Sequence, residues 1–152
     1  MINFTFKLNN KPISELKGGA FSYPAFSGMG QHKNKRFSIC IPNQGPIPIG
    51  TYHIFDRQSG GLLGPLRDWI DNKGNWFALY ANDGKIDDET FCEKVKRGQF
   101  RLHPKGDLGV SQGCITIESR SHYLTLWSLL KNTKQEKVPD SELMSYGKVV
   151  VL

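Results

Sequence analysis

Short apolar segments separated by turn residues make up most of this sequence, a pattern that favours short strands over long helices. In several segments apolar and polar residues alternate, as in 100–103, where Phe100 and Leu102 would share one face of a strand. Clusters such as Lys17-Gly18-Gly19 separate these segments. The expected strands cover 3–7, 20–23, 36–41, 51–55, 76–80, 100–103, 114–117 and 148–152.

Two segments favour a helix. In 121–131, Leu124, Trp127 and Leu130 recur at helical spacing, and Ser119 or Ser121 is available as N-cap. A shorter helix is expected over 87–96. The chain has 152 residues and no repeat or linker that would divide it. We therefore predict one domain over residues 1–152, mainly β, a sandwich or barrel with one or two short helices.

The composition is that of a globular protein with one core. Hydrophobic residues make up 38% of the chain, enough to form a core without metals or disulfides. No segment approaches the roughly 18 apolar residues of a membrane span. The first eight residues alternate and lack the basic and apolar regions of a signal peptide. We expect a protein that stays in the cytosol, has been trimmed, or leaves the cell by a route that reads no such signal.

The formal net charge of +6 suits a polyanionic partner. The basic residues are scattered, however, and no nucleic-acid-binding motif accompanies them, so we expect no nucleic acid partner. A carboxylate-rich cell-wall polymer would suit the charge equally well, as would an ordinary solvated surface. The charge alone does not choose between them.

One stretch of the sequence carries the residues of a thiol–imidazole pair. His103 ends one expected strand, a polar, glycine-rich loop follows, and Cys114 begins the next strand. A free thiol has a pKa near 8.5 and is mostly protonated at neutral pH. A histidine within hydrogen-bond reach accepts that proton and activates the sulfur. We predict that Cys114 is a nucleophile and that His103 is its base.

The loop between these two residues supplies further groups. Gly113 has no Cβ, so the backbone N–H groups of Gly113 and Cys114 can form an oxyanion hole, worth about 2.7–4 kcal/mol per donor. Ser111 is expected to brace the loop or to bond the imidazole. We expect a backbone carbonyl or Ser111, rather than Asp107, to orient His103. The sequence has no C-x-x-C pair and no ligand spacing for zinc, so we expect neither a metal nor a cofactor.

These residues resemble a known family. Ser-Gln-Gly-Cys-Ile at 111–115, preceded by His103, resembles the Ser/Thr-His-Gly-Cys signature of L,D-transpeptidase catalytic domains. It is more similar still to the small L,D-transpeptidase-like effectors delivered by type VI secretion. Two more segments agree with that group, Ala-Phe-Ser-Gly at 25–28 and Gly-Pro-Ile-Pro-Ile-Gly-Thr-Tyr at 45–52. The resemblance spans roughly residues 20–120.

The resemblance implies a β-rich L,D-transpeptidase-like fold and covalent catalysis through Cys114. The implied substrate is the tetrapeptide stem of peptidoglycan, attacked at the L,D bond between its third and fourth residues. Release to water is L,D-carboxypeptidase activity, and release to an amine is transpeptidation or exchange of the terminal D-amino acid. The substrate-binding residues that we predict are Arg101, Gln112, Ser27 and Tyr52.

The resemblance also implies a setting, an antibacterial effector that is secreted without a signal peptide and acts in the periplasm of a target bacterium. Its partners would be peptidoglycan stem peptides, an immunity protein and a component of the secretion machine. Two positions depart from the larger family, because Gln112 replaces its usual second histidine and Thr116 stands near its usual arginine. The separation of His103 and Cys114 is also shorter than in typical cross-linking enzymes. Hydrolysis or exchange is therefore expected rather than cross-linking.

The chain has three cysteines, so at least one is free unless it pairs between chains. In an oxidising compartment Cys40–Cys92 is the one intrachain pair that spares Cys114. Two other functions stay open from the sequence. One is a non-catalytic peptidoglycan-binding module that uses the same groove, and the other is a cytosolic thiol hydrolase acting on another acyl substrate.

Overall fold

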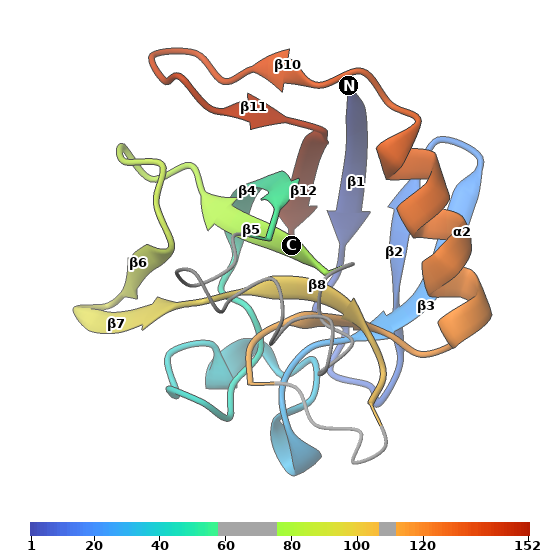
Figure 1. Cartoon of the computed structure of the whole chain (residues 1–152). Helices are drawn as coiled ribbons and strands as arrows, with labels where there is room; N and C mark the ends of the chain where they lie inside the picture. The colour runs from blue at the N-terminus through green and yellow to red at the C-terminus, as the bar shows by residue number, and fades with distance from the viewer. Residues whose placement is uncertain (58–75, 107–111) are drawn as a thin grey trace, which may run out of the picture.

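A closed barrel of eight strands forms the body of the protein (Figure 1). The computed structural model describes residues 1–57, 76–106 and 112–152. The strand order around the barrel is β1–β12–β4–β5–β8–β9–β3–β2. The prediction of a mainly β sandwich or barrel is confirmed. The bounds are β1 (Ile2–Phe6), β2 (Ser14–Gly18), β3 (Phe21–Phe26), β4 (Gly50–Asp56), β5 (Phe77–Ala81), β8 (Arg101–Pro104), β9 (Ile115–Ile117) and β12 (Gly147–Val151).

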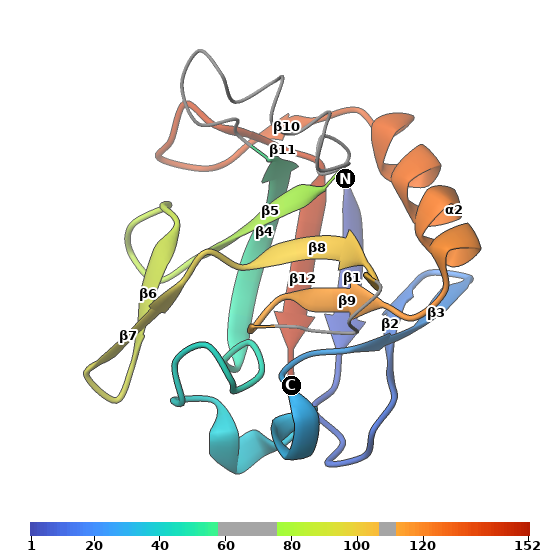
Figure 2. The same ribbon diagram turned by 60° about the horizontal axis from the view of Figure 1, so that its bottom comes forward.

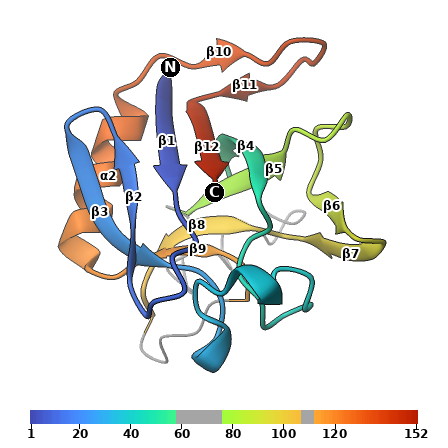
Figure 3. The same cartoon turned by 180° about the vertical axis from the view of Figure 1, so that it is seen from behind.

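Alternation along the strands fills the barrel with apolar side chains. Phe4 and Phe6 of β1 point into the same core as Leu102 of β8 and Ile115 of β9, and all four are fully buried. The pairs β1–β12 and β8–β9 run parallel, and the other barrel neighbours run antiparallel. Figure 2 shows β8 and β9 crossing in front of β1, β12 and β4, which Figure 3 shows from behind. Residues at the ends of β8 and β9 therefore meet at one edge.

One α-helix in the described part of the chain, α2 (Arg120–Lys131), packs on the barrel directly after β9 (Figure 1). It buries Tyr123, Leu126 and Leu130, and the Tyr123 hydroxyl donates to the carbonyl of Leu102 at 3.2 Å. The helix predicted over 121–131 is confirmed. Its buried stripe is shifted from the predicted one, however, because Leu124 is 48% exposed.

The helix predicted over 87–96 is wrong. This segment forms a hairpin of β6 (Glu89–Cys92) and β7 (Val95–Gly98), which projects from the side of the barrel (Figure 1). Glu93 and Lys94 both have positive φ, 47° and 72°, as a two-residue hairpin turn requires. Glutamate and lysine favour helices, but the alternating burial of β6 and its attachment to the barrel override that propensity.

The strand predicted over 36–41 is also wrong. The chain between β3 and β4 instead forms two short 3-10 turns, η1 (Gly30–His32) and η2 (Arg36–Ser38). Side chains bind the backbone of this excursion where a strand ladder would otherwise do so. The buried Asn34, for example, accepts from the backbone N–H of Ser27 and donates to the carbonyl of Lys11. Strand β2 was not predicted, because it buries only one large apolar side chain, Leu16.

A second small hairpin, β10 (Glu136–Lys137) and β11 (Met144–Ser145), covers the outer face of the barrel near β4 and β5. Phe55, Ala78 and Val138 form a minor apolar cluster beneath it. Across the described residues, no helix has the length and apolarity needed to cross a membrane.

Candidate functional site

The parallel pair β8–β9 brings together the segments that carry His103 and Cys114. The register places His103 directly opposite Thr116 and Leu102 opposite Ile115. Leu102 and Ile115 point into the core, so His103 and Thr116 point to the other face. Cys114 directly precedes β9 and stands two residues before Thr116. The backbone N–H of Arg101, the neighbour across β8, donates to the Cys114 sulfur.

A backbone carbonyl fixes the orientation of His103. Nδ1 lies 2.7 Å from the carbonyl oxygen of Pro104, and because a carbonyl only accepts, Nδ1 carries the proton. In the neutral ring Nε2 is then the basic nitrogen, and it lies 3.4 Å from the Thr116 hydroxyl. The carbonyl thus takes the orienting role that the sequence left to a carbonyl or Ser111. Ser111 and Asp107 lie outside the described residues.

An aromatic ring covers the imidazole. Trp76 stacks on His103 with ring centroids 4.3 Å apart and planes 19° from parallel. The His103 side chain is almost fully buried by this ring and by the strands beside it. A flat ring in this position limits rotation of the imidazole.

The Cys114 thiol lies beside an ion pair. Arg101 binds Asp88 through two hydrogen bonds of 2.8 and 2.7 Å. Burial raises the pKa of the Cys114 thiol, the Arg101 N–H and guanidinium lower it, and Asp88 raises it. Burial is the largest of these effects, so the resting thiol is protonated at neutral pH. Attack by this sulfur therefore requires a base.

The residue before the thiol must be glycine. Gly113 has φ of +102°, in the region that side chains disfavour. A Cβ there would lie 2.6 Å from Nη2 of Arg97 and 3.0 Å from the ring of Phe100. The turn that presents Cys114 is thus packed directly on Arg97.

Arg97 connects β7 to the 39–46 segment at this site. It was not among the site residues predicted from the sequence. Its side chain is 4% exposed, and its guanidinium donates to the carbonyls of Ile39, of Pro46 at 3.2 Å and of Gly45 at 3.1 Å. Burial lowers its pKa, and the three carbonyls compensate the lost hydration. In sequence Arg97 is one of several charged residues in 93–97, and no local signal marks it as buried.

A disulfide makes a second connection across the same region. Cys40 and Cys92 are joined, with Cα atoms 5.3 Å apart, and Cys114 is the free cysteine. This is the pairing that spares Cys114. Together with Arg97 it fastens the 39–46 segment to the β6–β7 hairpin.

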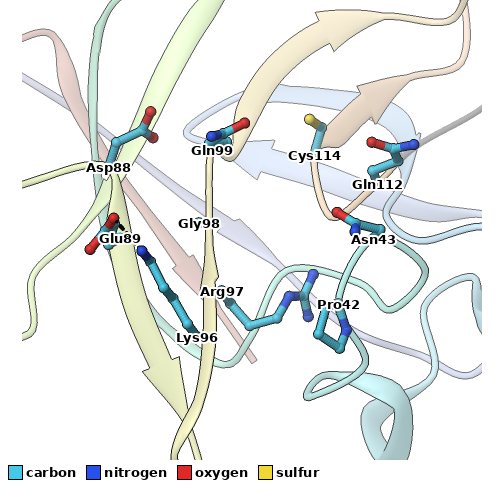
Figure 4. A pocket seen from close by; sticks show the side chains of 10 residues that line it. All are labelled: Pro42, Asn43, Asp88, Glu89, Lys96, Arg97, Gly98, Gln99, Gln112 and Cys114. Carbon is cyan, nitrogen blue, oxygen red and sulfur yellow. Dashed lines mark ion pairs between the residues drawn. The ribbon is translucent and has the colours of Figure 1, made fainter.

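A hollow of about 420 Å³ opens between the 39–46 segment and the β6–β7 hairpin, which form its two walls (Figure 4). Its size is typical of small-ligand sites. Cys114 lies at one end of it and the Glu89–Lys96 ion pair at the other. A second hollow, of about 460 Å³, adjoins it and shares Asn43 and Gln112. The lining of the first hollow is Pro42, Asn43, Asp88, Glu89, Lys96, Arg97, Gly98, Gln99, Gln112 and Cys114.

The structure places the four predicted substrate-binding residues differently. Gln112 lines both hollows. Arg101 lies next to the thiol but is paired with Asp88. Ser27 is fully buried and accepts from the N–H of Ile47, and Tyr52 is buried and donates to the carbonyl of Pro48 at 2.7 Å. The last two side chains therefore brace the wall and do not line either hollow.

The match to a family model covers most of the chain. Residues 22–141 match the model of the Tlde1 domain. The chain belongs to the Tlde1 domain family. This family consists of type VI secretion effectors related to the L,D-transpeptidases. Searches of curated proteins and of solved structures return no match. Among the residues with described positions, no group of three or more His, Cys, Asp or Glu side chains is arranged to hold a metal in this Tlde1 domain.

Replacing Gly113 by alanine should damage both stability and the site. We expect Gly113→Ala to lower the free energy of unfolding by about 1–3 kcal/mol, because the new Cβ meets Arg97 in a strained backbone conformation. Urea unfolding measures this. Gly106→Ala is the matched control, since nothing lies within 4 Å of a Cβ there, and it should change stability by about 0.5 kcal/mol or less. Equal effects of the two substitutions would contradict the packing of Gly113 on Arg97.

Loss of the disulfide should destabilise the Tlde1 domain. Cys40 and Cys92 are separated by 52 residues, and closing a loop of that size is worth up to about 4 kcal/mol. We expect Cys40→Ala/Cys92→Ala to lose about 2–4 kcal/mol in urea unfolding. A reductant should cause the same loss in the unmodified chain and none in the double variant. A reductant without effect on the unmodified chain would refute the linkage.

The Arg101–Asp88 ion pair should shift the pH at which the Cys114 thiol becomes reactive toward an alkylating agent. Thiolate is the reactive form, so the rate with iodoacetamide rises through the thiol pKa. Arg101→Gln removes a cation and should move the midpoint of the rate profile to higher pH. Asp88→Asn removes an anion and should move it to lower pH. Asp87→Asn, which changes an acid paired with Lys85, is the control and should leave the midpoint in place.

Proposed function

We propose that this Tlde1 domain is a cysteine enzyme that cleaves the L,D bond between the third and fourth residues of peptidoglycan tetrapeptide stems. Cys114 is the nucleophile and His103 the base. The observation that supports this most directly is the parallel register of β8 and β9, which puts the strand that carries His103 beside the strand that Cys114 directly precedes. The backbone carbonyl that holds the proton on Nδ1 leaves Nε2 as the basic atom. A thiol and an oriented neutral imidazole are the two parts that covalent acyl transfer needs.

The reaction begins with proton transfer. Nε2 of His103 takes the thiol proton as the sulfur attacks the carbonyl carbon of the third stem residue. A C–S bond forms, and the carbonyl oxygen becomes an oxyanion, which the backbone N–H groups of Gly113 and Cys114 are proposed to stabilise. The imidazolium then returns the proton to the amine of the fourth residue as the C–N bond breaks. This leaves a thioester on Cys114 and a free D-amino acid.

The second half of the reaction resolves the thioester. His103 takes a proton from water or from the amine of an incoming D-amino acid, which attacks the thioester carbonyl. The sulfur leaves and is reprotonated, giving a tripeptide or an exchanged tetrapeptide. Gln112 lines both hollows, so an acceptor in the second hollow would lie next to the thioester.

Because burial raises the pKa of the Cys114 thiol, the proposed base has to remove the thiol proton for attack to occur. A thiol that is protonated at rest does not react indiscriminately, and it becomes nucleophilic when the base removes its proton. Trp76 supports the same role, because its stacked ring limits rotation of the imidazole.

The disulfide and the family support a place of action. Disulfides persist in oxidising compartments such as the bacterial periplasm, where peptidoglycan lies. We propose that the protein enters a target cell as a type VI effector and depletes tetrapeptide stems there. An immunity protein and a component of the secretion machine are its proposed partners.

Product analysis tests the proposal. A disaccharide tetrapeptide incubated with the protein should yield a tripeptide, or an exchanged tetrapeptide when a D-amino acid is added, both detected by mass spectrometry. Cys114→Ala should abolish both products, and His103→Gln should lower the rate about 10²–10⁴-fold. The exposed His122 offers a matched control, and His122→Gln should retain full activity. Binding of the tetrapeptide without any product from the unmodified chain would instead indicate a wall-binding module.

A further inference from the structure

We propose that the Glu89–Lys96 ion pair is a specificity-determining element for a substrate side chain that ends in both an ammonium and a carboxylate. This inference rests on the proposed function, which places the third stem residue at Cys114. It adds Glu89 and Lys96 as the groups that bind the side chain of the third stem residue.

The pair stands at the far end of the hollow from the nucleophile. Glu89 begins β6, Lys96 belongs to β7, and Oε1 and Nζ lie 2.8 Å apart. Both line the hollow that contains Cys114, and Figure 4 shows Gly98 and Gln99 between them and the sulfur. A group that reaches this pair from the attacked carbonyl must therefore sit on a long side chain.

Gly98 keeps the hairpin closed next to the pair. It is the register partner of Glu89, and a Cβ on it would lie 2.3 Å from the carbonyl oxygen of Asp88. The two strands of the hairpin approach each other closely at this point. The positions of Glu89 and Lys96 are thus fixed by backbone, while their side chains stay free to rearrange.

The other charged side chains that line the hollow, Arg97 and Asp88, already have binding partners within the protein. Arg97 is buried and donates to three backbone carbonyls, and Asp88 binds Arg101 bidentately, with side chains 31% and 18% exposed. Glu89 and Lys96 are 52% and 63% exposed. Half-exposed pairs contribute little to stability, so this pair can open for a ligand at small cost.

A zwitterionic group fits the opened pair better than a single charge does. Its ammonium would bind Glu89 and its carboxylate Lys96, so that all four charges stay paired in a partly desolvated hollow. A side chain with an ammonium alone competes with Lys96 for Glu89 and leaves one cation unpaired. The matching chemical class is the amino-acid end of a diaminodicarboxylic acid, rather than the single amine of a lysine.

Three tetrapeptides that differ only at the third residue test this. The first carries meso-diaminopimelate, the second its side-chain carboxamide and the third L-lysine. We expect kcat/KM for the first to exceed that for the other two by roughly fivefold, the scale of one half-exposed charge pair. The same order of affinity should appear in calorimetric binding to Cys114→Ala, which needs no turnover.

Two variants separate the contributions. Lys96→Gln should lower kcat/KM about fivefold for meso-diaminopimelate. It should not lower kcat/KM for the other two substrates, because they have no carboxylate to lose and no longer compete with Lys96 for Glu89. Glu89→Gln should weaken all three, since each carries the ammonium. Lys137→Gln changes a lysine of similar exposure, 57% against 63%, that pairs with Glu142 on another hairpin, and it should leave all rates unchanged.

The outcomes are distinct. If Lys96→Gln affects all three substrates equally, or if the unmodified chain does not discriminate, the inference fails although the proposed function stands. If no substrate is cleaved, the proposed function fails, and the binding series with Cys114→Ala alone decides whether Glu89 and Lys96 recognise the zwitterion.

Discussion

One buried cation, the Arg97 guanidinium, organises the region around Cys114. The Arg97 guanidinium joins β7 to three carbonyls of the 39–46 segment and packs under the glycine that precedes Cys114. A buried charge is costly unless every donor is satisfied, so the position of each carbonyl is tightly constrained. The disulfide Cys40–Cys92 fastens the same two parts covalently. The hollow exists because both connections hold a loop and a hairpin at a fixed separation.

The barrel contributes the other half of the site. Parallel pairing of β8 and β9 brings His103 and Thr116 side by side and sets Cys114 against Arg101. The rigid ladder fixes the positions of the side chains, while local groups set their chemistry. The Pro104 carbonyl selects the tautomer of His103, and the Arg101–Asp88 pair moderates the thiol pKa that burial raises.

The segments that matched the family serve the site in different ways. The matched segment at 111–115 contains Cys114, the proposed nucleophile, whereas the segments at 25–28 and 45–52 lie in the wall. A hydrogen bond of 2.8 Å from the Ile47 N–H to the Ser27 hydroxyl joins these two wall segments. Arg97 donates to the carbonyls of Gly45 and Pro46, the two residues before Ile47. Sequence similarity in the wall therefore reflects the support of the hollow rather than contact with a ligand.

The mainly β class, helix α2 and the candidate pair His103 and Cys114 could be predicted from the sequence, because these depend on local periodicity and on residue type. The sequence did not determine the 87–96 hairpin or the roles of Ser27, Tyr52 and Arg97. Glu93 and Lys94 favour a helix locally, and long-range attachments at Cys92 and Arg97 override that preference. Which charge is buried and which thiols pair emerge only from the folded chain. These two properties depend on contacts between residues more than 50 positions apart, such as Arg97 with Pro46 and Gly45 and Cys40 with Cys92, which no local pattern encodes.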